Sequence, residues 1–472
     1  MPRRWAGSTA VSGQRLKANT LGGNLPDTAW WQAQLAVGKG GIAMRSAAAT
    51  SLTAFIASRI ASRPAVFIMA GHMEEAGLAS RELVMRRYNH RTTQAIQTYM
   101  HMLPGEVHQN LGAYITQASA DTIARWEALL NPDAEVANQD DTPTPTHRTR
   151  RRPGANLVDD AGDEDAEHPD APQTKTVHIQ STLTGYIDMC TYEGLLDHHT
   201  QAEGWPHVRR LRDIADKEVK HSWLWALNKN HGPVIPSEEY TDAVRVRLGA
   251  AGPDEPAPCA RCDNIIDSAG SHCLTCAIGP ATRGHNQVAR IVHELATITD
   301  SSAEREALGL IPSHPTLRPA DILTTATASG STTALDVGIT SPDCGTAGTD
   351  CCQSMYQRKR DRYAPHITEL ERNGITYVPI VWSAYGRPHE AAIDAIRNMA
   401  RRAARRRGHS DAVTIFNRAM HNISVEIWRR NAAMVKHCWP GEADDVMADD
   451  SGETPGGSDP PLAGRLPACY GL

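Results

Sequence analysis

Four residues of the kinds that bind zinc lie within one short stretch of this chain. Cys259 and Cys262 form a Cys-x2-Cys pair, and His272 and Cys276 follow as a His-x3-Cys pair. Two thiolates on a knuckle turn, with a second ligand pair on the next turn, match the spacing of structural zinc sites. By spacing alone, Cys273 can replace His272 and give an all-cysteine site. A small, closed zinc site is therefore the strongest constraint on the fold.

The composition is that of an ordinary globular protein from a reducing compartment. Ten cysteines in 472 residues are too few for a disulfide scaffold, so we expect the nucleus, or else the cytoplasm, and no secretion. The N-terminus lacks a hydrophobic signal core and no run reaches about 18 apolar residues, so we expect no membrane span. The net charge of −6 conceals separate acidic and arginine-rich segments, which leaves room for a basic surface that binds nucleic acid.

Hydrophobic periodicity predicts an α-rich, α+β protein. The predicted parts are a helical segment 1–131, a disordered linker 132–176, a helical connector 177–254, the zinc knuckle 255–282, an α/β core 283–390, basic closing helices 391–439 and a disordered tail 440–472. Strands of the α/β core are expected at 322–325, 333–340 and 376–382. In the connector, the periodicity predicts that Trp205, Trp225 and Leu227 are buried.

Two aspartates lie at the first two predicted strands. Asp321 leads into one strand and Asp336 lies within the next, so an antiparallel hairpin would bring both carboxylates to one edge. Phosphodiester hydrolysis requires divalent cations held by carboxylates, and we predict such a magnesium or manganese site here. Lys359 is the nearest lysine that can orient the attacking water or stabilise the phosphate, and Glu306 is a candidate third ligand. An Asp pair alone is also typical of surface turns; its place directly after the zinc knuckle favours the catalytic interpretation.

One predicted closing helix carries a row of arginines. Arg397, Arg401 and Arg405 recur every fourth residue and therefore share one face, which could neutralise several DNA phosphates without reading sequence. The alternative is a solvated helix face paired with local acids. The sequence has no glycine-rich phosphate loop followed by Lys-Ser or Lys-Thr, so we expect no nucleotide cofactor.

Several short motifs between the zinc knuckle and the second aspartate resemble a known family. They are Cys-x2-Cys, Gly-Ser-His-x3-Cys, Arg-Gly-His-Asn, Arg-Pro-Ala-Asp, Ala-Leu-Asp-Val and Ile-Thr-Ser-Pro. Together they resemble the carboxy-terminal part of non-LTR retrotransposon polyproteins that carry a restriction-like endonuclease. Upstream, Leu25-Pro-Asp-Thr-Ala-Trp30 and Gly40-Gly-Ile-Ala-Met-Arg45-Ser resemble the segment that follows the reverse transcriptase thumb. The resemblance extends over 25–130 and 180–437.

The resemblance implies a role for each matching residue. The zinc ligands would be Cys259, Cys262, His272 and Cys276, which decides the register against Cys273. The acids of the PD-(D/E)xK core would be Asp321 and Asp336, followed by Lys359. Residues expected to contact nucleic acid are Arg283, His285, Arg318 and Tyr363, with Arg397, Arg401 and Arg405 on the closing helix. The sequence departs from the family pattern where Ala320 separates Pro319 from Asp321 and where the lysine lies farther from the second acid than usual.

The resemblance also implies a function. The expected activity is a Mg²⁺- or Mn²⁺-dependent DNA endonuclease that nicks target DNA for target-primed reverse transcription, with DNA and the element's RNA as partners and zinc as a structural metal. No Tyr/Phe-x-Asp-Asp motif occurs in the sequence, so no polymerase activity is expected. One alternative is a catalytically inactive, nucleic-acid-binding remnant of the element. Another is a zinc ribbon that binds proteins only, which the retrotransposon-like motifs on both sides disfavour.

Overall fold

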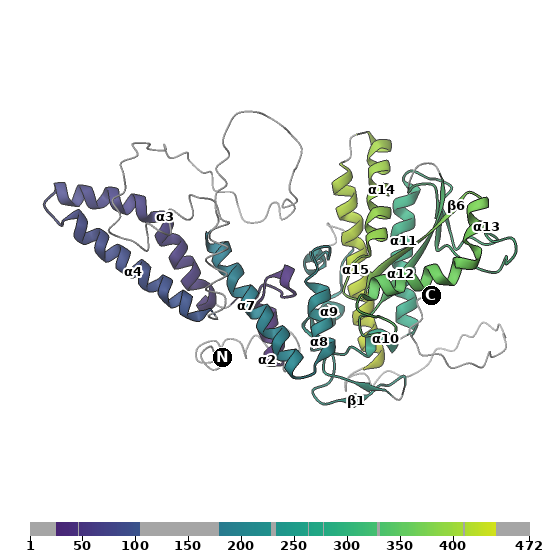
Figure 1. Cartoon of the computed structure of the whole chain (residues 1–472), viewed down its shortest axis with the longest axis horizontal. Coiled ribbons are helices and arrows are strands. Elements are labelled where there is room, and N and C mark those ends of the chain that lie inside the picture. Colours follow the sequence, from purple (N-terminus) through teal and green to yellow (C-terminus); the bar gives the residue numbers. More distant parts are fainter. Residues whose placement is uncertain are drawn as a thin grey trace. The chain divides into compact units, whose positions relative to one another are not determined.

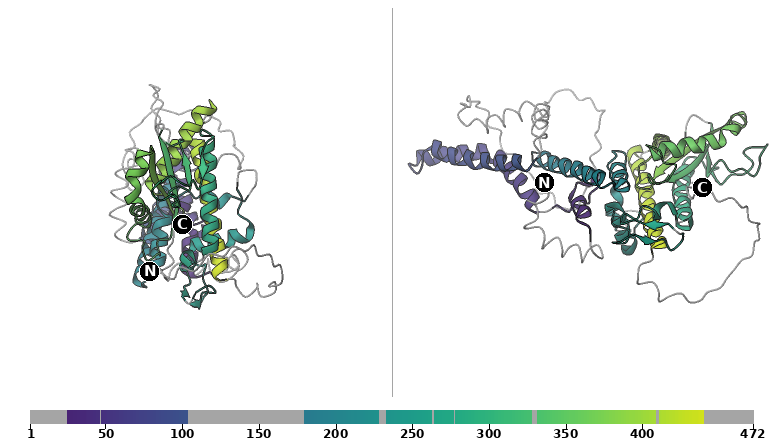
Figure 2. Two further views of the ribbon diagram at one scale, coloured as in Figure 1. Left: turned by 90° about the vertical axis from the view of Figure 1, so that its right-hand side faces the viewer. Right: turned by 60° about the horizontal axis from the view of Figure 1, so that its bottom comes forward.

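The computed structural model of this chain describes residues 25–45, 47–103, 179–227, 233–262, 264–276, 278–327, 331–408 and 411–439. These residues form helices and two small sheets, so the α+β class predicted from the sequence is confirmed (Figures 1 and 2). The chain divides into two compact units, Met1–Ser46 with Asp188–Leu472, and Ala47–Ile187. The predicted linker and tail, and the predicted helical pattern beyond residue 103, lie outside the described residues.

The smaller unit is built on a helical hairpin. Helices α3 (Ala47–Glu75) and α4 (Arg81–Met102) pack against each other, and the first residues of α7 (Ile179–Gln201) belong to the same unit. Ser80 caps α4, because its hydroxyl accepts a hydrogen bond from the Leu83 backbone N–H. Among the described residues, no single helix is long and apolar enough to cross a membrane; the two arms of α3, bent by 55°, meet that length and composition test only as a pair.

The larger unit contains the remaining elements. They are α2 (Asp27–Gln34), η2 (Val37–Lys39), the rest of α7, α8 (Trp205–Ile214), η3 (Ser222–Trp225), α9 (Ser237–Leu248), β1 (Ala257–Pro258), β2 (Ile265–Ile266), α10 (Cys273–Cys276), α11 (Ile278–Thr297), β3 (Glu304–Arg305), β4 (Ile322–Thr324), β5 (Thr332–Thr340), α12 (Cys351–Tyr363), η5 (Ala364–His366), α13 (Ile367–Arg372), β6 (Ile375–Ser383), α14 (Glu390–Arg407) and α15 (Ala412–Cys438). The three predicted strands and the two closing helices are confirmed.

The main sheet has the order β3-β4-β5-β6 and mixes strand directions. The pairs β3–β4 and β4–β5 are antiparallel, as predicted for the hairpin, whereas β5 and β6 are parallel and are connected through α12 and α13. A parallel pair needs such a crossover, and a helix is its usual form. The sequence did not predict β3, which has only two residues.

Helices cover both faces of this sheet (Figure 1). Leu335 and Val337 on β5 pack with α11, α14 and α15, while Ala334 packs on the opposite face in a cluster that includes Tyr363 of α12 and Leu370 of α13. This alternation is the period of two that any strand shows. Asp336 therefore shares a face with Ala334, toward α12, and it is the only acid among the nine residues of β5.

Side chains at the ends of the helices fix where they begin. The Asp350 carboxylate accepts hydrogen bonds from the N–H groups of Cys352 and Gln353 at the start of α12. Asp411 caps α15 in the same way, through Val413 and Thr414. Such caps are each worth about 1 kcal/mol. They set the position of α12, and therefore of Lys359, along the sheet.

Two buried arginines fasten the N-terminal segment to the connector. Arg247 donates to the carbonyl oxygens of Val37 (2.7 Å) and Gly41 (3.1 Å), and Arg210 donates to Gln32 Oε1 (2.9 Å). Neither forms an ion pair with a carboxylate within the described part of the chain. Burial lowers the pKa of Arg210 to about 10 and that of Arg247 to about 9. Backbone carbonyls therefore take the place of acids around these two cations.

The predicted burial of three connector residues is wrong. Trp205, Trp225 and Leu227 are exposed, by 49%, 57% and 60%. The helical pattern is interrupted twice here: α7 ends at Gln201 and α8 begins only at Trp205, and after Ile214 only the short turn η3 precedes α9. Periodicity identifies a buried stripe only where one helix continues without a break.

Candidate functional sites

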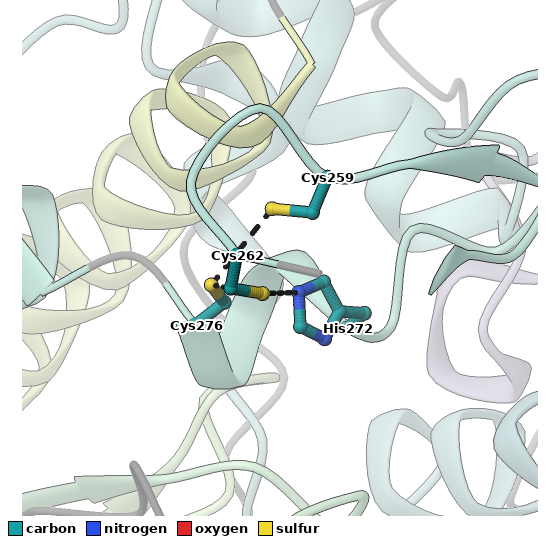
Figure 3. Close-up of side chains that lie close together, drawn as sticks. All are labelled: Cys259, Cys262, His272 and Cys276. Atoms are coloured by element: carbon teal, nitrogen blue, oxygen red, sulfur yellow. Dashed lines mark hydrogen bonds between the residues drawn. The ribbon is translucent and has the colours of Figure 1, made fainter. Parts of the chain in front are cut away.

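The four predicted zinc ligands are gathered in one cluster (Figure 3). Their ligand atoms all lie within 4.8 Å of one another. The Cys262 sulfur is 3.3 Å from His272 Nε2 and 3.4 Å from the Cys276 sulfur, and the sulfurs of Cys259 and Cys276 are 3.9 Å apart. Zinc holds thiolates at about 2.3 Å and imidazole at about 2.0 Å in a tetrahedron, so neighbouring ligand atoms lie slightly under 4 Å apart. The cluster could therefore hold a metal such as zinc.

Local structure sets the register of this cluster. The strands β1 and β2 form a short antiparallel hairpin that places Cys259 and Cys262 in its turn, and Gly270, with φ +70°, makes the tight turn before His272 and α10. Cys273 is fully buried in the neighbouring apolar core. Its contact with Cys438, together with burial, raises the pKa of the Cys438 thiol. The structure therefore places His272, and not Cys273, among the four potential ligands, and Cys273 is a core residue.

The knuckle is attached to the end of α15. The Ala260 N–H donates to the Cys438 carbonyl (3.1 Å), and Arg261 Nε donates to the His437 carbonyl (3.1 Å). These bonds satisfy carbonyl groups that a helix C-terminus leaves without partners. A zinc ion in the knuckle would therefore stabilise one end of the longest described helix of the larger unit as well as its own loop.

The carboxylates of Asp321 and Asp336 meet at the edge of the β4–β5 hairpin. The Asp321 N–H donates to the Leu335 carbonyl (2.9 Å), and Asp321 Oδ2 accepts a hydrogen bond from the Val337 N–H (2.7 Å), so Asp321 lies against both neighbours of Asp336 on β5. Two carboxylates this close together repel, and the charge of Asp336 contributes to raising the pKa of Asp321. The hairpin that the sequence predicted therefore brings both acids together.

Lys359 reaches this pair from α12. Its Nζ lies 2.6 Å from Asp336 Oδ1, and both side chains are about nine-tenths buried. Gly338 makes room for it, because a Cβ on that residue would lie 2.9 Å from Lys359 Cε. Although the lysine lies far from the second acid in the sequence, the packing of α12 on β5 brings the two side chains into contact. Gly338, on the same face of β5, has no side chain that would block Lys359.

Three of the four carboxylate oxygens accept a hydrogen bond from the protein, and the fourth faces a histidine ring. The Asp336 oxygens accept from Lys359 Nζ and from the Tyr377 hydroxyl (2.5 Å). The Asp321 oxygens face the Val337 backbone N–H (2.7 Å) and His285 Nε2 (3.3 Å). A carboxylate oxygen has two lone pairs, so one remains on each oxygen. The carboxylates are thus fixed in place and still able to bind a cation.

The charges at this site do not balance. Burial, and next the charge of Asp336, raise the pKa of Asp321 to about 7. Burial, and next Lys359, lower the pKa of His285 to about 4, so at neutral pH this imidazole is uncharged and is not the partner in an ion pair. Lys359 pairs with Asp336, while Asp321 forms no ion pair with a lysine or arginine among the described residues. Hard oxygen ligands with excess negative charge are the donor set that Mg²⁺ and Mn²⁺ prefer.

The Glu306 carboxylate is paired with an arginine and not with the two aspartates. It follows β3 with φ +52°, its carboxylate is 53% exposed, and its Oε2 is 3.3 Å from Arg318 Nη1. Its backbone N–H, by contrast, donates to the Asp321 carbonyl (3.0 Å). In this arrangement the Glu306 backbone supports the turn that carries Asp321, and the carboxylate that the sequence suggested as a third ligand is paired with Arg318.

The residues expected to contact nucleic acid divide into exposed and buried sets. Exposed members are Arg283, Arg318, Arg397, Arg401 and Arg405. Arg397 is paired with Asp394 (3.1 Å), which is the local pairing that the alternative interpretation of this helix face predicted. Tyr363 is buried, and its hydroxyl donates to the Arg318 carbonyl (2.9 Å), so it supports the turn before Asp321 and its ring does not face solvent. His285 is 9% exposed and faces Asp321.

Tyr377 is the residue at this site that the sequence analysis missed. It lies on β6, where Pro379 pairs with Asp336, and is therefore two residues away from that partner on the same face. The only available signal was its position in a predicted strand next to the one that carries Asp336, and nothing in the sequence stated that these two strands are neighbours.

A second group of potential ligands, Asp350, Cys351 and Cys352, lies at the start of α12. Both Asp350 oxygens are engaged by Arg387, and one also caps the helix. The Cys352 sulfur lies 3.4 Å from the Arg387 carbonyl. These contacts explain the cluster as a helix cap with an ion pair, without a metal.

Comparisons of this chain with protein-family models, with curated proteins and with solved structures give no match.

Proposed function

We propose that this chain is a retrotransposon-derived, metal-dependent DNA endonuclease of the PD-(D/E)xK type, which nicks target DNA for target-primed reverse transcription. The observation that carries the proposal is the convergence of Asp321, Asp336 and Lys359 at one strand edge, with three of the four carboxylate oxygens accepting hydrogen bonds from the protein. A surface-turn interpretation of the two aspartates accounts for neither the burial of Lys359 nor these hydrogen bonds.

The proposed chemistry assigns a part to each residue. A bound Mg²⁺ or Mn²⁺ supplies a Lewis acid and an acidified water molecule. Asp321 and Asp336 hold the ion through the lone pairs that the protein donors leave free. Lys359 pairs with Asp336 and would place a positive charge beside the phosphate, where charge develops in the transition state. The uncharged His285 ring lies 3.3 Å from Asp321 and leaves the charge of that carboxylate for the ion.

DNA binding is assigned to the exposed arginines. Arg283 is exposed near the start of α11, and Arg318 is exposed in the turn before Asp321. Arg401 and Arg405 are exposed on α14. The Cys/His cluster, with zinc bound, would hold the knuckle rigid beside Arg283 at the start of α11. Neutralising phosphates in this way gives affinity that depends on salt and carries no sequence information.

A second candidate function is a catalytically inactive protein that still binds nucleic acid. The observation that favours it is the pairing of Glu306 with Arg318, which leaves two carboxylates at the strand edge in place of the predicted three. In that case the exposed arginines and the knuckle retain their roles, and Lys359 and Asp336 form a buried structural pair.

Nicking of supercoiled plasmid by the zinc-loaded chain, with Mg²⁺ or Mn²⁺, distinguishes the two functions. The test variant is Asp321→Asn, which keeps the side-chain volume, and the matched control is Asp361→Asn, which removes an exposed carboxylate on α12. The endonuclease predicts nicking by wild type and control and a loss on the order of 10³-fold or more in Asp321→Asn, the size of several kcal/mol of transition-state stabilisation. Salt-sensitive DNA binding without nicking would establish the inactive binder. A chain that neither nicks nor binds DNA would refute both functions.

A further inference from the structure

The Asp336 carboxylate is held on both sides, and the second donor comes from a strand that carries no other group of the candidate site. Lys359 Nζ lies 2.6 Å from Oδ1, and the Tyr377 hydroxyl lies 2.5 Å from Oδ2. We propose that Tyr377 is a positioning residue that fixes the Asp336 carboxylate for binding a divalent cation. This inference rests on the proposed endonuclease function and adds to it a residue that neither the sequence motifs nor the resemblance indicates.

The phenol has one proton and two acceptors within reach. Asp336 Oδ2 is 2.5 Å away, whereas the Lys359 carbonyl oxygen is 3.3 Å away. A hydrogen bond to an ionised acceptor is shorter and roughly twice as strong as one to a neutral group. The Tyr377 hydroxyl therefore donates its main hydrogen bond to the Asp336 carboxylate, and its contact with the Lys359 carbonyl is weaker. Tyr377 thereby links the strand that carries Asp336 to the helix that carries Lys359.

The position of the Tyr377 ring is set by packing. The side chain is 7% exposed, and its ring lies 5.0 Å from the ring of Tyr363 at an interplanar angle of 58°. Such tilted pairs are a favoured arrangement of aromatic rings. Because the ring is fixed in this way, its hydroxyl reaches the carboxylate from a constant direction.

Two donors fix the orientation of the Asp336 carboxylate, whereas one donor does not. A carboxylate held by Lys359 alone can rotate about its Cβ–Cγ bond with Oδ1 near the ammonium group. A second donor on Oδ2 fixes the plane of the carboxylate, and with it the direction of the lone pairs that remain for a cation beside Asp321. Hydrogen-bond partners of metal ligands typically contribute 10–100-fold to metal affinity or activity.

The test is Mn²⁺ binding by the full, zinc-loaded chain without DNA, followed by the EPR signal of free Mn²⁺. Tyr377→Phe removes the hydroxyl and keeps the ring. The matched control is Tyr240→Phe, which removes a hydroxyl that donates to the Leu224 carbonyl (2.9 Å) in a different core. We expect Tyr377→Phe to bind Mn²⁺ about 10–100-fold more weakly and Tyr240→Phe to bind as wild type does.

A second readout is the rate of plasmid nicking against Mn²⁺ and DNA concentration. In Tyr377→Phe, half-saturation by Mn²⁺ should move upward by the same factor, saturating Mn²⁺ should restore most of the rate, and the KM for DNA should not change. A general structural defect would lower the rate at every Mn²⁺ concentration. As a second variant, 3-fluorotyrosine at position 377 keeps both the ring and the donor and should retain wild-type affinity.

The outcomes separate this inference from the function on which it rests. If wild type binds Mn²⁺ and nicks DNA while Tyr377→Phe has the same Mn²⁺ affinity, the inference is overturned and the endonuclease stands. If wild type neither binds Mn²⁺ nor nicks, the proposed function fails. Weak Mn²⁺ binding by Tyr377→Phe, with normal binding by the fluorotyrosine protein and by Tyr240→Phe, supports the positioning role.

Discussion

The ligands of the Cys/His cluster come from one stretch of chain between Cys259 and Cys276, whereas the groups around the two aspartates come from α11, the turn before β4, β5, α12 and β6. The first cluster needs only a hairpin and a short helix to form. The second forms only when a sheet with parallel and antiparallel pairs is assembled with a helix on each side.

This difference determines how each cluster responds to change. Spacing along the chain fixes the Cys/His cluster, so losing one ligand should remove the metal and leave the core of the larger unit folded. Packing fixes the carboxylate cluster, so a change there should affect the stability of the whole sheet. The two clusters meet at α11, which begins just after Cys276 and carries His285 to Asp321.

The largest effect is expected from removing a thiolate of the Cys/His cluster. Cys276→Ser should abolish binding of one zinc ion per chain, because it removes one of the four ligands of a tetrahedral site whose zinc binding free energy is on the order of 10 kcal/mol. Zinc content measured by mass spectrometry, together with hydrogen exchange at 255–276, checks this. Cys190→Ser, a thiol on α7, is the control, and Cys273→Ala should keep its zinc. Loss of zinc in Cys273→Ala would restore the all-cysteine register.

A large effect on global stability is expected at the carboxylate cluster. Asp336→Asn leaves Lys359 buried without a counter-ion, and breaking one partner of a buried pair costs about 3–5 kcal/mol. The double variant Asp336→Asn/Lys359→Met removes both charges and should recover much of that loss. Urea unfolding measures both. Equal unfolding free energies for wild type and Asp336→Asn would show that this ion pair is not formed in the folded protein.

Sequence patterns could predict the elements of this fold better than their contacts. The β-branched runs at 333–340 and 376–382 predicted β5 and β6, and the spacing of Cys259 to Cys276 predicted the cluster. Hairpin geometry predicted that Asp321 and Asp336 meet. Each of these depends on residues close together in the chain.

Predictions that depended on distant contacts were less complete. Tyr377 was missed because the parallel pairing of β5 with β6 is not visible in either strand alone. Tyr363 was expected at nucleic acid, but packing between α12 and the sheet turns it inward. The buried arginines of the connector were missed for the same reason, since arginine on a helix is usually exposed, and the backbone carbonyls of the distant residues Val37 and Gly41 help to make the burial of Arg247 acceptable.

The pH dependence of stability tests the connector independently of the two clusters. Burial, and next the charge of the adjacent arginine, lower the pKa of His207 and of His221 to about 3, and each histidine faces that arginine through Nδ1. Because the folded pKa lies below the unfolded value, the stabilisation is complete above pH 6.5 and is lost as the pH falls. At pH 5.5 each histidine should cost about 1.4 kcal/mol relative to pH 7.5.

The variant His207→Gln/His221→Gln tests this effect. Its urea midpoint should change less between pH 7.5 and pH 5.5 than that of wild type, by an amount equal to about 3 kcal/mol in unfolding free energy. Other titrating groups, including Asp321, act equally in both proteins and cancel in the difference. The same pH dependence in both proteins would mean that these histidines are protonated in the folded state or are not buried.

The smallest effect tests whether α11 transmits change from one cluster to the other. A Cβ on Gly284 would lie 2.5–2.6 Å from Cβ, Cγ and Cδ of Arg430, which is buried on α15. The stem of that side chain cannot move aside cheaply, so Gly284→Ala should cost about 1–3 kcal/mol. It should also move His285, the next residue, away from Asp321. Gly279→Ala on the same helix has open space around its Cβ and should be neutral or stabilising by up to about 1 kcal/mol.

Zinc content decides what Gly284→Ala means. If the Cys/His cluster is fixed by its own spacing, this variant should keep one zinc ion per chain while its unfolding free energy falls and its Mn²⁺ affinity weakens. A variant that loses stability and zinc together would show instead that α11 couples the two clusters. The knuckle would then depend on the packing of the sheet through the same bonds that attach it to the end of α15.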